Sequence, residues 1–401
     1  MSSSPENMAG AGAGEKSSAT GAAAVSSVNN EESNSSMVTT TVSRETDGKP
    51  GKPRRQRTDR GALLRYLGLR LVLIIPTVWI LVTVVFFLMR LTGDPITAAL
   101  GAKVTPEELA ARKAAAGYDR PLLVQYGEYL WGILHGDFGT STTLGNRPIS
   151  DILVTYGPAT LELGFWALIV AFAVGIPLGR LAARHYNRLA DVLIRSFAVL
   201  FYAAPVFFVA LLLKLVFAQG LGWLPTSGRA SIPVQTVLET RVSPDTNIYI
   251  INAILYGDPA YIVDVLKHAI LPALALGLLT AGVFIRLVRI NLLQTLRADY
   301  VTAARARGVK ESAVVSKHAF RNALIPVVTV MGMQIALMLG GAILTETSFE
   351  WQGLGYWLAK YLTARDFVAV QGIVTFIALV VAVASFVIDA VNALVDPRVR
   401  Y

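Results

Sequence analysis

Residues 299–326 of this chain read DYVTAARARGVKESAVVSKHAFRNALIP. The first part is rich in alanine and arginine, which favour a helix. Gly308 follows at the point where a glycine in the left-handed conformation would end that helix. A second helical run would place Val314, Val315 and His318 on a shared face. The stretch therefore predicts two short helices that bend at a glycine.

Two long apolar segments flank this stretch, so it is a loop of a membrane protein, and Asn322 and Pro326 mark the start of the helix that follows. Small residues before Gly308 would let another protein come close. The long basic side chains of Arg305 and Arg307 would reach acidic groups on that protein. The alternative is that the basic residues only orient the chain, since cytoplasmic loops are commonly basic.

The composition is that of a membrane protein, because 54% of the 401 residues are hydrophobic and 16% are charged. The chain has no cysteine, which excludes disulfides, iron–sulfur clusters and thiolate zinc sites. A net charge of +9 could suggest a nucleic-acid partner. However, the basic residues cluster beside apolar segments, which is typical of membrane orientation. The four histidines fall in separate connecting segments, so we expect no metal site.

Six apolar segments have about the 20 residues needed to cross a bilayer. They are residues 67–90, 158–179, 196–219, 269–289, 323–345 and 367–391. Segment 180–195 has four basic residues and one acidic residue, and segment 286–321 has eight basic and two acidic residues. In contrast, segments 91–157 and 220–267 each have more acidic than basic residues. The positive-inside rule therefore predicts that both termini and the 299–326 loop are cytoplasmic. Residues 1–60 are poor in large apolar residues, which predicts a disordered cytoplasmic tail before a membrane domain at 61–401.

The loop resembles the coupling loop of permeases from ATP-binding-cassette (ABC) importers, here spanning about residues 291–322. Thr302, Ala303, Ala304 and Gly308 fall on its Glu-Ala-Ala-x-x-x-Gly pattern, with Thr302 in place of the glutamate. That replacement, and the phrases DYVTAARARGV and HAFRNALIPVVTVMG, are similar to the dipeptide and oligopeptide branch of the family. Other segments resemble the same branch, at residues 118–121, 135–141, 365–366 and 396–398.

The resemblance implies an all-α polytopic membrane protein with the type I ABC importer permease fold of six transmembrane helices. It implies a subunit of the bacterial inner membrane that forms half of a path for dipeptides or oligopeptides. The implied partners are a second homologous permease, two ATPase subunits or domains, an extracytoplasmic peptide-binding protein and membrane lipid, with no nucleic acid. The chain has no Walker sequence, so ATP and magnesium would be bound by the ATPase partners.

Two alternatives to a peptide importer are kept. The same type of importer could carry nickel chelates or oligosaccharides. A secondary transporter is less favoured, because it would show inverted repeats or paired intramembrane charges, and the sequence has no internal repeat. We expect no catalytic residue and no bound cofactor in this chain.

The candidate site residues form two groups. The residues implied to couple to the ATPase are Tyr300, Thr302, Ala303, Ala304, Arg305, Arg307, Gly308, Asn322 and Pro326. The candidates for the translocation path are Glu162, Lys214, Gln334 and Glu346. Ionisable residues inside predicted spans are expected to face a cavity or a partner charge. For Lys214 the alternative is that it reaches up to the lipid headgroups, and for Glu162 that it lies at the membrane interface.

Overall fold

The computed structural model describes residues 60–91, 93–94, 96–97, 104–115, 117–143 and 145–395. The predicted disordered tail over 1–60 lies, apart from its last residue, outside the described residues, as does the 396–398 segment. Within the described residues, the elements are helices, and the one extended pairing is an isolated bridge between Thr140 and Pro148. This agrees with the predicted all-α fold.

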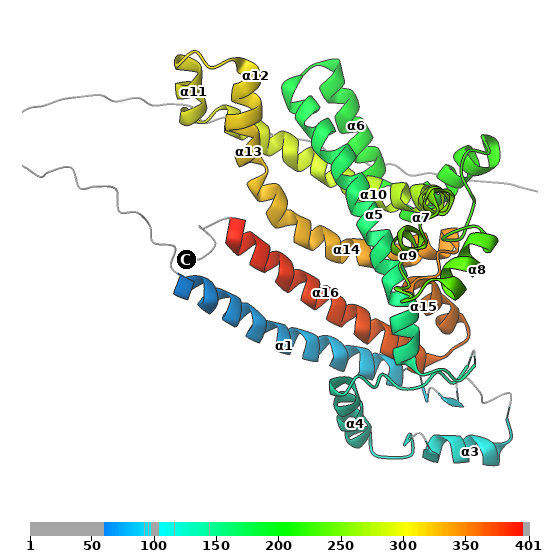
Figure 1. Cartoon of the computed structure of the whole chain (residues 1–401). Helices are drawn as coiled ribbons and strands as arrows, with labels where there is room; N and C mark the ends of the chain where they lie inside the picture. The colour runs from blue at the N-terminus through cyan, green and yellow to red at the C-terminus, as the bar shows by residue number, and fades with distance from the viewer. Residues whose placement is uncertain are drawn as a thin grey trace, which may run out of the picture. The chain divides into compact units, whose positions relative to one another are not determined.

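Five described helices are long and apolar enough to cross a membrane (Figure 1). They are α1 (Arg60–Leu91), α5 (Ile149–Arg184), α10 (Pro259–Leu296), α14 (Ile325–Phe349) and α16 (Phe367–Val395). Four of the six predicted spans lie wholly within one of these helices. The fifth, at 323–345, falls almost entirely within α14.

The third predicted span, residues 196–219, is broken rather than straight. It overlaps α6 (Leu189–Ala203), α7 (Val206–Leu213) and η1 (Lys214–Gly220), and α6 is bent by 108° relative to the helix formed by α7 and η1. Pro205 lies at the break and has no N–H to continue the helix. Ala204 before it is extended, with φ −73° and ψ 135°, as a residue preceding proline prefers. The described helices therefore provide five spans, or six if the bent pair is one span.

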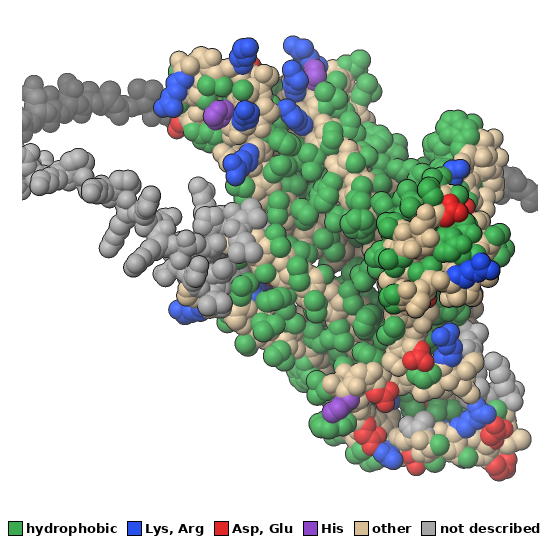
Figure 2. All heavy atoms as spheres, viewed as in Figure 1, with side chains coloured by type: hydrophobic (Ala, Val, Ile, Leu, Met, Phe, Trp, Pro, Cys, Tyr) green, Lys and Arg blue, Asp and Glu red, His purple; other side chains and the backbone are tan. Residues whose placement is uncertain are grey.

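Shorter helices lie in the segments that connect the spans. The segments predicted to be external contain α3 (Pro106–Ala115), α4 (Leu122–Leu134), α8 (Ile232–Arg241), α9 (Tyr249–Tyr256) and α15 (Leu354–Thr363). The 299–326 loop contains α11 (Asp299–Ala306), α12 (Glu311–Ala313), η2 (Val314–Ala319) and α13 (Phe320–Ala323). Figure 2 shows Lys, Arg and His side chains gathered around α11, α12 and the α5–α6 turn, while acidic side chains are prominent around α3 and α4.

Helices α5 and α10 pack against each other along much of their length. Glycine makes this close approach possible. A Cβ at Gly277 would lie 2.6 Å from the carbonyl oxygen of Ala167, and one at Gly179 would lie 2.8 Å from Cβ of Val288. Small residues let membrane helices come close enough for backbone and side chains to interlock. The α5–α10 pair therefore forms the centre of the bundle.

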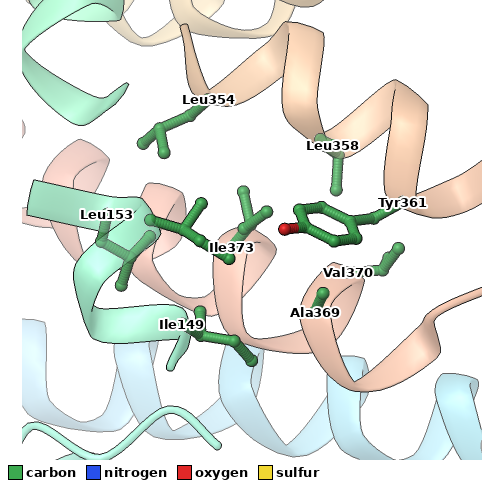
Figure 3. Close-up of a cluster of buried hydrophobic side chains, with 9 residues drawn as sticks. Ile149, Leu153, Leu354, Leu358, Tyr361, Ala369, Val370 and Ile373 are labelled. Carbon is green, nitrogen blue, oxygen red and sulfur yellow. The ribbon is translucent and has the colours of Figure 1, made fainter. Parts of the chain in front are cut away.

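A second core joins α5, α15 and α16 (Figure 3). Ile149 and Leu153 of α5 meet Leu358 and Tyr361 of α15, with Ile373 of α16 beside them. Burying such aliphatic and aromatic side chains contributes roughly 1.5–3 kcal/mol each. This core fixes α15 and the N-terminal end of α16 to α5.

The buried carboxylate of Asp366 connects two segments that are far apart in sequence. It accepts hydrogen bonds from Ser141 Oγ at 2.7 Å and from the backbone N–H groups of Thr142 and Thr143 at 2.8 and 2.9 Å. It also accepts one from the N–H of Ala369 in the first turn of α16. The 135–141 and 365–366 segments, which both carry the family resemblance, therefore meet in the fold.

Candidate functional site

The first helix of the 299–326 loop ends at Gly308 as the sequence predicts. Gly308 has φ +74°, in the left-handed region. Its N–H donates to the carbonyl of Arg305 at 2.9 Å, and the N–H of Val309 donates to the carbonyl of Ala304 at 3.3 Å. These two bonds make a Schellman motif, which satisfies the last carbonyls of a helix. The chain leaves α11 in a fixed direction because of this motif.

An ion pair links the two sides of the glycine bend. Arg305 Nε and Nη2 donate to the two carboxylate oxygens of Glu311 at 3.0 and 2.8 Å, and Nη1 reaches the carbonyl of Leu296 at 3.3 Å. The hydrogen-bonded guanidinium lowers the pKa of the Glu311 carboxyl, so the pair is charged at neutral pH. Arg305 thus helps to hold the loop together in this conformation, and its contact with another protein stays a prediction.

Helix α11 has a buried face and an exposed face. Val301 and Ala304 are buried in a cluster with Ala183 of α5 and Leu292 of α10. Ala304 therefore belongs to the core of the loop and not to its surface. The exposed candidates here are Tyr300, Thr302, Ala303, Arg305, Arg307 and Gly308, and Ala306 is exposed with them. The exposed face of α11 therefore consists mainly of small side chains, with basic residues at its C-terminal end.

The second half of the loop differs from the prediction. Val314 and Ala319, five residues apart, are both buried, whereas His318 is exposed. Segment η2 is a π-helix, whose i→i+5 bonds add one residue per turn and shift the buried face. The prediction that Val314, Val315 and His318 share a face is therefore wrong.

The predicted start of the helix after the loop is confirmed, because Pro326 lies in the first turn of α14. A proline is tolerated there, since the first N–H groups of a helix have no partner within it. Asn322 precedes this start and is exposed, and its Nδ2 donates to the carbonyl of His318 at 3.4 Å. Both candidates thus lie on the accessible side of the loop.

Glu162, the first path candidate, is 3% exposed, and both of its carboxylate oxygens accept hydrogen bonds. Arg229 Nη2 donates to its Oε2 at 2.6 Å. The N–H groups of Tyr249 and Ile250, in the first turn of α9, donate to the same carboxylate at 3.2 and 3.0 Å. Glu162 therefore has a partner charge and fastens the segment around α8 and α9 to α5. Arg229 is 67 residues away in sequence, and no local pattern identifies it as the partner.

Lys214 contacts the end of a helix. Its Nζ donates to the carbonyl of Ser348 at 2.8 Å and lies 5.5 Å from the centre of the Phe349 ring. Carbonyl groups at a helix C-terminus carry partial negative charge and attract a cation. Lys214 therefore joins the bent α7–η1 segment to the end of α14.

Glu346 and Gln334, the two candidates on α14, are also buried. Glu346 Oε2 accepts a hydrogen bond from the N–H of Tyr356 at 3.0 Å, in the first turn of α15. A Cβ at Gly353 would lie 2.5 Å from this carboxylate, so only a glycine fits there without a shift. Glu162, Gln334 and Glu346 face the interior of the chain in this conformation, and their place along a path stays a prediction.

The sequence matches the binding-protein-dependent transport system inner membrane component family over residues 175–401, and the N-terminal component of these systems over residues 63–151. The chain belongs to this family. Its resemblance to the dipeptide branch of ABC importer permeases is confirmed by curated relatives.

Two DppB permeases and a glutathione permease illustrate the similarity. The dipeptide transport system permease protein DppB of Escherichia coli (strain K12) is 37% identical over 84% of this chain and 99% of that protein. The di/tripeptide transport system permease protein DppB of Pseudomonas aeruginosa (strain UCBPP-PA14) is 36% identical over 84% and 99%. The glutathione transport system permease protein GsiC of Salmonella typhimurium is 35% identical over 84% and 100%. The chain is thus a multi-pass inner membrane permease.

One charged pair of this permease was not identified from the sequence. Asp191 of α6 is fully buried, and Arg289 of α10 donates to its two oxygens at 2.6 and 2.8 Å. In the sequence, both residues count only as charges that set the orientation. The available signal was weak: Asp191 is the one acidic residue of the basic segment 180–195.

Proposed function

We propose that the chain is one transmembrane subunit of an ATP-driven importer of short peptides. The 84% coverage by dipeptide, di/tripeptide and glutathione permeases supports this substrate class. The observation that carries the proposal is the loop around Gly308. It is short, its bend is fixed by a Schellman motif and an ion pair, and it exposes the small side chains of α11.

Coupling follows from how this loop is attached. It connects α10, which packs along α5, to α14, which packs against α16. A groove on an ATPase subunit would accept Thr302, Ala303 and Ala306, which offer little steric resistance to a close surface. Movement of the ATPase would then displace α5 and α10 together with α11, because Val301 and Ala304 pack α11 against the ends of α5 and α10.

The other parts of the importer supply what this chain does not. Two ATPase subunits or domains would bind ATP and magnesium, and a second homologous permease would complete the path. An extracytoplasmic binding protein would deliver the peptide and select it. The end of the chain that carries α11–α12 and the α5–α6 turn would face the cytoplasm, which the basic side chains of that end support (Figure 2).

The test is uptake by the complex purified from native membranes and reconstituted in proteoliposomes. A labelled dipeptide should accumulate only with ATP, and glutathione should compete if tripeptides are also accepted. A labelled nickel chelate and a labelled oligosaccharide are the comparison substrates. Peptide accumulation without ATP, or uptake of nickel with no uptake of peptide, would contradict the proposal.

A further inference from the structure

The turn between α5 and α6 lies beside the coupling loop and is exposed. Its side chains include the basic Arg184 and Arg188, the aromatic Tyr186, which is 46% exposed, and Leu189, which is 73% exposed. Figure 1 shows this turn and the α11–α12 part of the loop at the same end of the bundle, and Figure 2 shows basic side chains on both. The α5–α6 turn and the α11–α12 part of the coupling loop are therefore both basic.

The shape of this turn is fixed by hydrogen bonds. Asn187 has φ +59°, a left-handed conformation that asparagine tolerates better than most residues. Its N–H donates to the carboxylate of Asp191 at 3.0 Å. The N–H of Arg188 donates to the carbonyl of His185 at 2.9 Å, and that of His185 to the carbonyl of Leu181 at 3.0 Å. The turn has one defined geometry as a result.

The buried ion pair between Asp191 and Arg289 stabilises the turn. Asp191 accepts hydrogen bonds from the N–H of Asn187 and from Nε and Nη2 of Arg289, whose guanidinium lies 5.4 Å from the ring of Tyr186. Burying such a pair costs desolvation energy, and one attested role of buried polar pairs is to specify a single conformation. The pair positions Tyr186 and the backbone of the turn relative to α10.

The turn and the coupling loop belong to one packed body. Ala183, directly before the turn, is buried in the same cluster as Val301 and Ala304 of α11. Arg180 lies 5.2 Å from the ring of Phe320 in α13. Gly179 allows α5 to contact α10 so closely that an added Cβ would lie 2.9 Å from a backbone carbonyl oxygen of α10. The turn therefore keeps a fixed position relative to the coupling loop.

We propose that the α5–α6 turn, residues 184–189, is a second contact with the ATPase partner, next to the coupling groove. This rests on the proposed function. The partner surface would be acidic opposite Arg184 and Arg188 and would hold a shallow apolar site for Tyr186. Lipid headgroups would also attract the arginines, but they adapt to any shape. The fixed turn and its exposed aromatic ring favour a protein surface.

The chain has no cysteine, so single cysteines give a clean test. Arg188→Cys on the turn and Ala303→Cys on α11 would be labelled with a short thiol-reactive photocrosslinker in the complete complex. The control is Leu200→Cys on the apolar surface of α6, where the side chain is 65% exposed. Crosslinked products would be identified as the ATPase by labelling with photoreactive azido-ATP.

We expect both Ala303→Cys and Arg188→Cys to give a product that binds azido-ATP, and Leu200→Cys to give none. A product from Ala303→Cys but not from Arg188→Cys would overturn the second contact and leave the proposed function intact. Crosslinking of Arg188→Cys to lipid alone would assign the turn to the membrane surface. No ATPase product from either position would contradict the proposed function as well.

A charge reversal measures what the contact contributes. Arg184→Glu combined with Arg188→Glu should weaken retention of the ATPase about tenfold at low salt, since exposed charge pairs are individually weak but two are reversed here. The difference should shrink at high salt because screening weakens exposed pairs. Arg65→Glu, a single charge reversal at an exposed residue of α1, is the control and is compared with Arg188→Glu alone. Equal retention in wild type and the double variant would contradict the proposal.

Discussion

Arg305 and Glu311 face each other across Gly308 and share two hydrogen bonds of 3.0 and 2.8 Å. The pair closes the bend between α11 and α12, at the same place where the Schellman motif ends α11. Both side chains are largely exposed, at 41% and 60%. The bend is therefore shaped mainly by the glycine backbone and secondarily by the ion pair.

Glu311→Gln should modestly weaken the interaction that holds the bend between α11 and α12. Exposed ion pairs contribute roughly 0.2–1 kcal/mol, which corresponds to at most about a fivefold loss of substrate-stimulated ATP hydrolysis. The reversed pair, Arg305→Glu with Glu311→Arg, should recover much of that loss. ATPase assays of the reconstituted complex provide the measurement, and full activity of Glu311→Gln at neutral pH would show that the pair is dispensable.

The same pair predicts a pH dependence. Hydrogen bonding to Arg305 lowers the pKa of Glu311 in the folded protein. The stabilisation is therefore present above the carboxyl's unfolded pKa and is lost as the pH falls through the lower, folded value. Wild type and Glu311→Gln should differ at neutral pH and converge in acid, which thermal unfolding of the solubilised permease over a pH series would detect.

Gly277→Ala should destabilise the α5–α10 pair. The added Cβ would lie 2.6 Å from a backbone oxygen of α5, so the helices must separate. Overpacking of this kind costs roughly 1–3 kcal/mol. Gly340→Ala is the matched control, because a Cβ there meets nothing within 4 Å. Thermal unfolding in detergent should show a lower Tm for Gly277→Ala alone, and equal values would contradict the packing described here.

Hydropathy and residue chemistry predicted the spans and the glycine bend because both depend on local sequence. Long apolar runs identify α1, α5, α10, α14 and α16 without any knowledge of which helices they contact. Gly308 was predicted because a helix stop needs a left-handed residue. The break at Pro205 also had a local signal, a proline inside an apolar run, although the run was interpreted as one span.

The features that were missed depend on tertiary contacts. The Glu162–Arg229 and Asp191–Arg289 pairs each join segments far apart in sequence, and without an alignment no pattern pairs them. The π-helix at η2 moved His318 to the surface and brought Ala319 into the core with Val314. A helical period of 3.6 residues cannot anticipate that insertion. Burial of Ala304 rather than Ala303 was likewise set by how α11 packs on α5 and α10.

Arg229→Ala should leave Glu162 buried without its cation. Removing one partner of a buried pair costs roughly 3–5 kcal/mol. The segment around α8 and α9 should then become sensitive to protease added from outside. Glu162→Gln combined with Arg229→Met removes both charges and should be less damaging. Proteolysis of membrane vesicles compares the two variants, and equal resistance of Arg229→Ala and wild type would rule out this anchoring role.

The orientation can be tested with fusions to a reporter that is active only in the cytoplasm. Fusion after Lys310, in the basic loop, should be active, whereas fusions after Asp137 and Thr236 should be inactive. The expectation follows from the excess of Lys and Arg over Asp and Glu in segments 180–195 and 286–321. Activity at Asp137 or Thr236 would reverse the orientation proposed for the permease.

Substitution of Gly308 tests the coupling function of the loop. Gly308 has φ +74° and open space where a Cβ would stand, so a substitution is strained by its backbone conformation and not by a clash. Valine should cost about 1–3 kcal/mol there, and alanine about 1–2 kcal/mol. Asparagine adopts the left-handed conformation more readily and is the matched control. Each of these costs is small compared with the free energy gained when the apolar spans insert into the membrane. All three variants should therefore accumulate in the membrane.

The measurement is substrate-stimulated ATP hydrolysis and peptide uptake by equal amounts of each variant complex. Gly308→Val should lose both activities, Gly308→Ala should retain part of them, and Gly308→Asn should remain close to wild type. If Gly308→Val transports peptide like the wild type, the loop does not couple the permease to its ATPase, and its basic residues serve only to orient the chain.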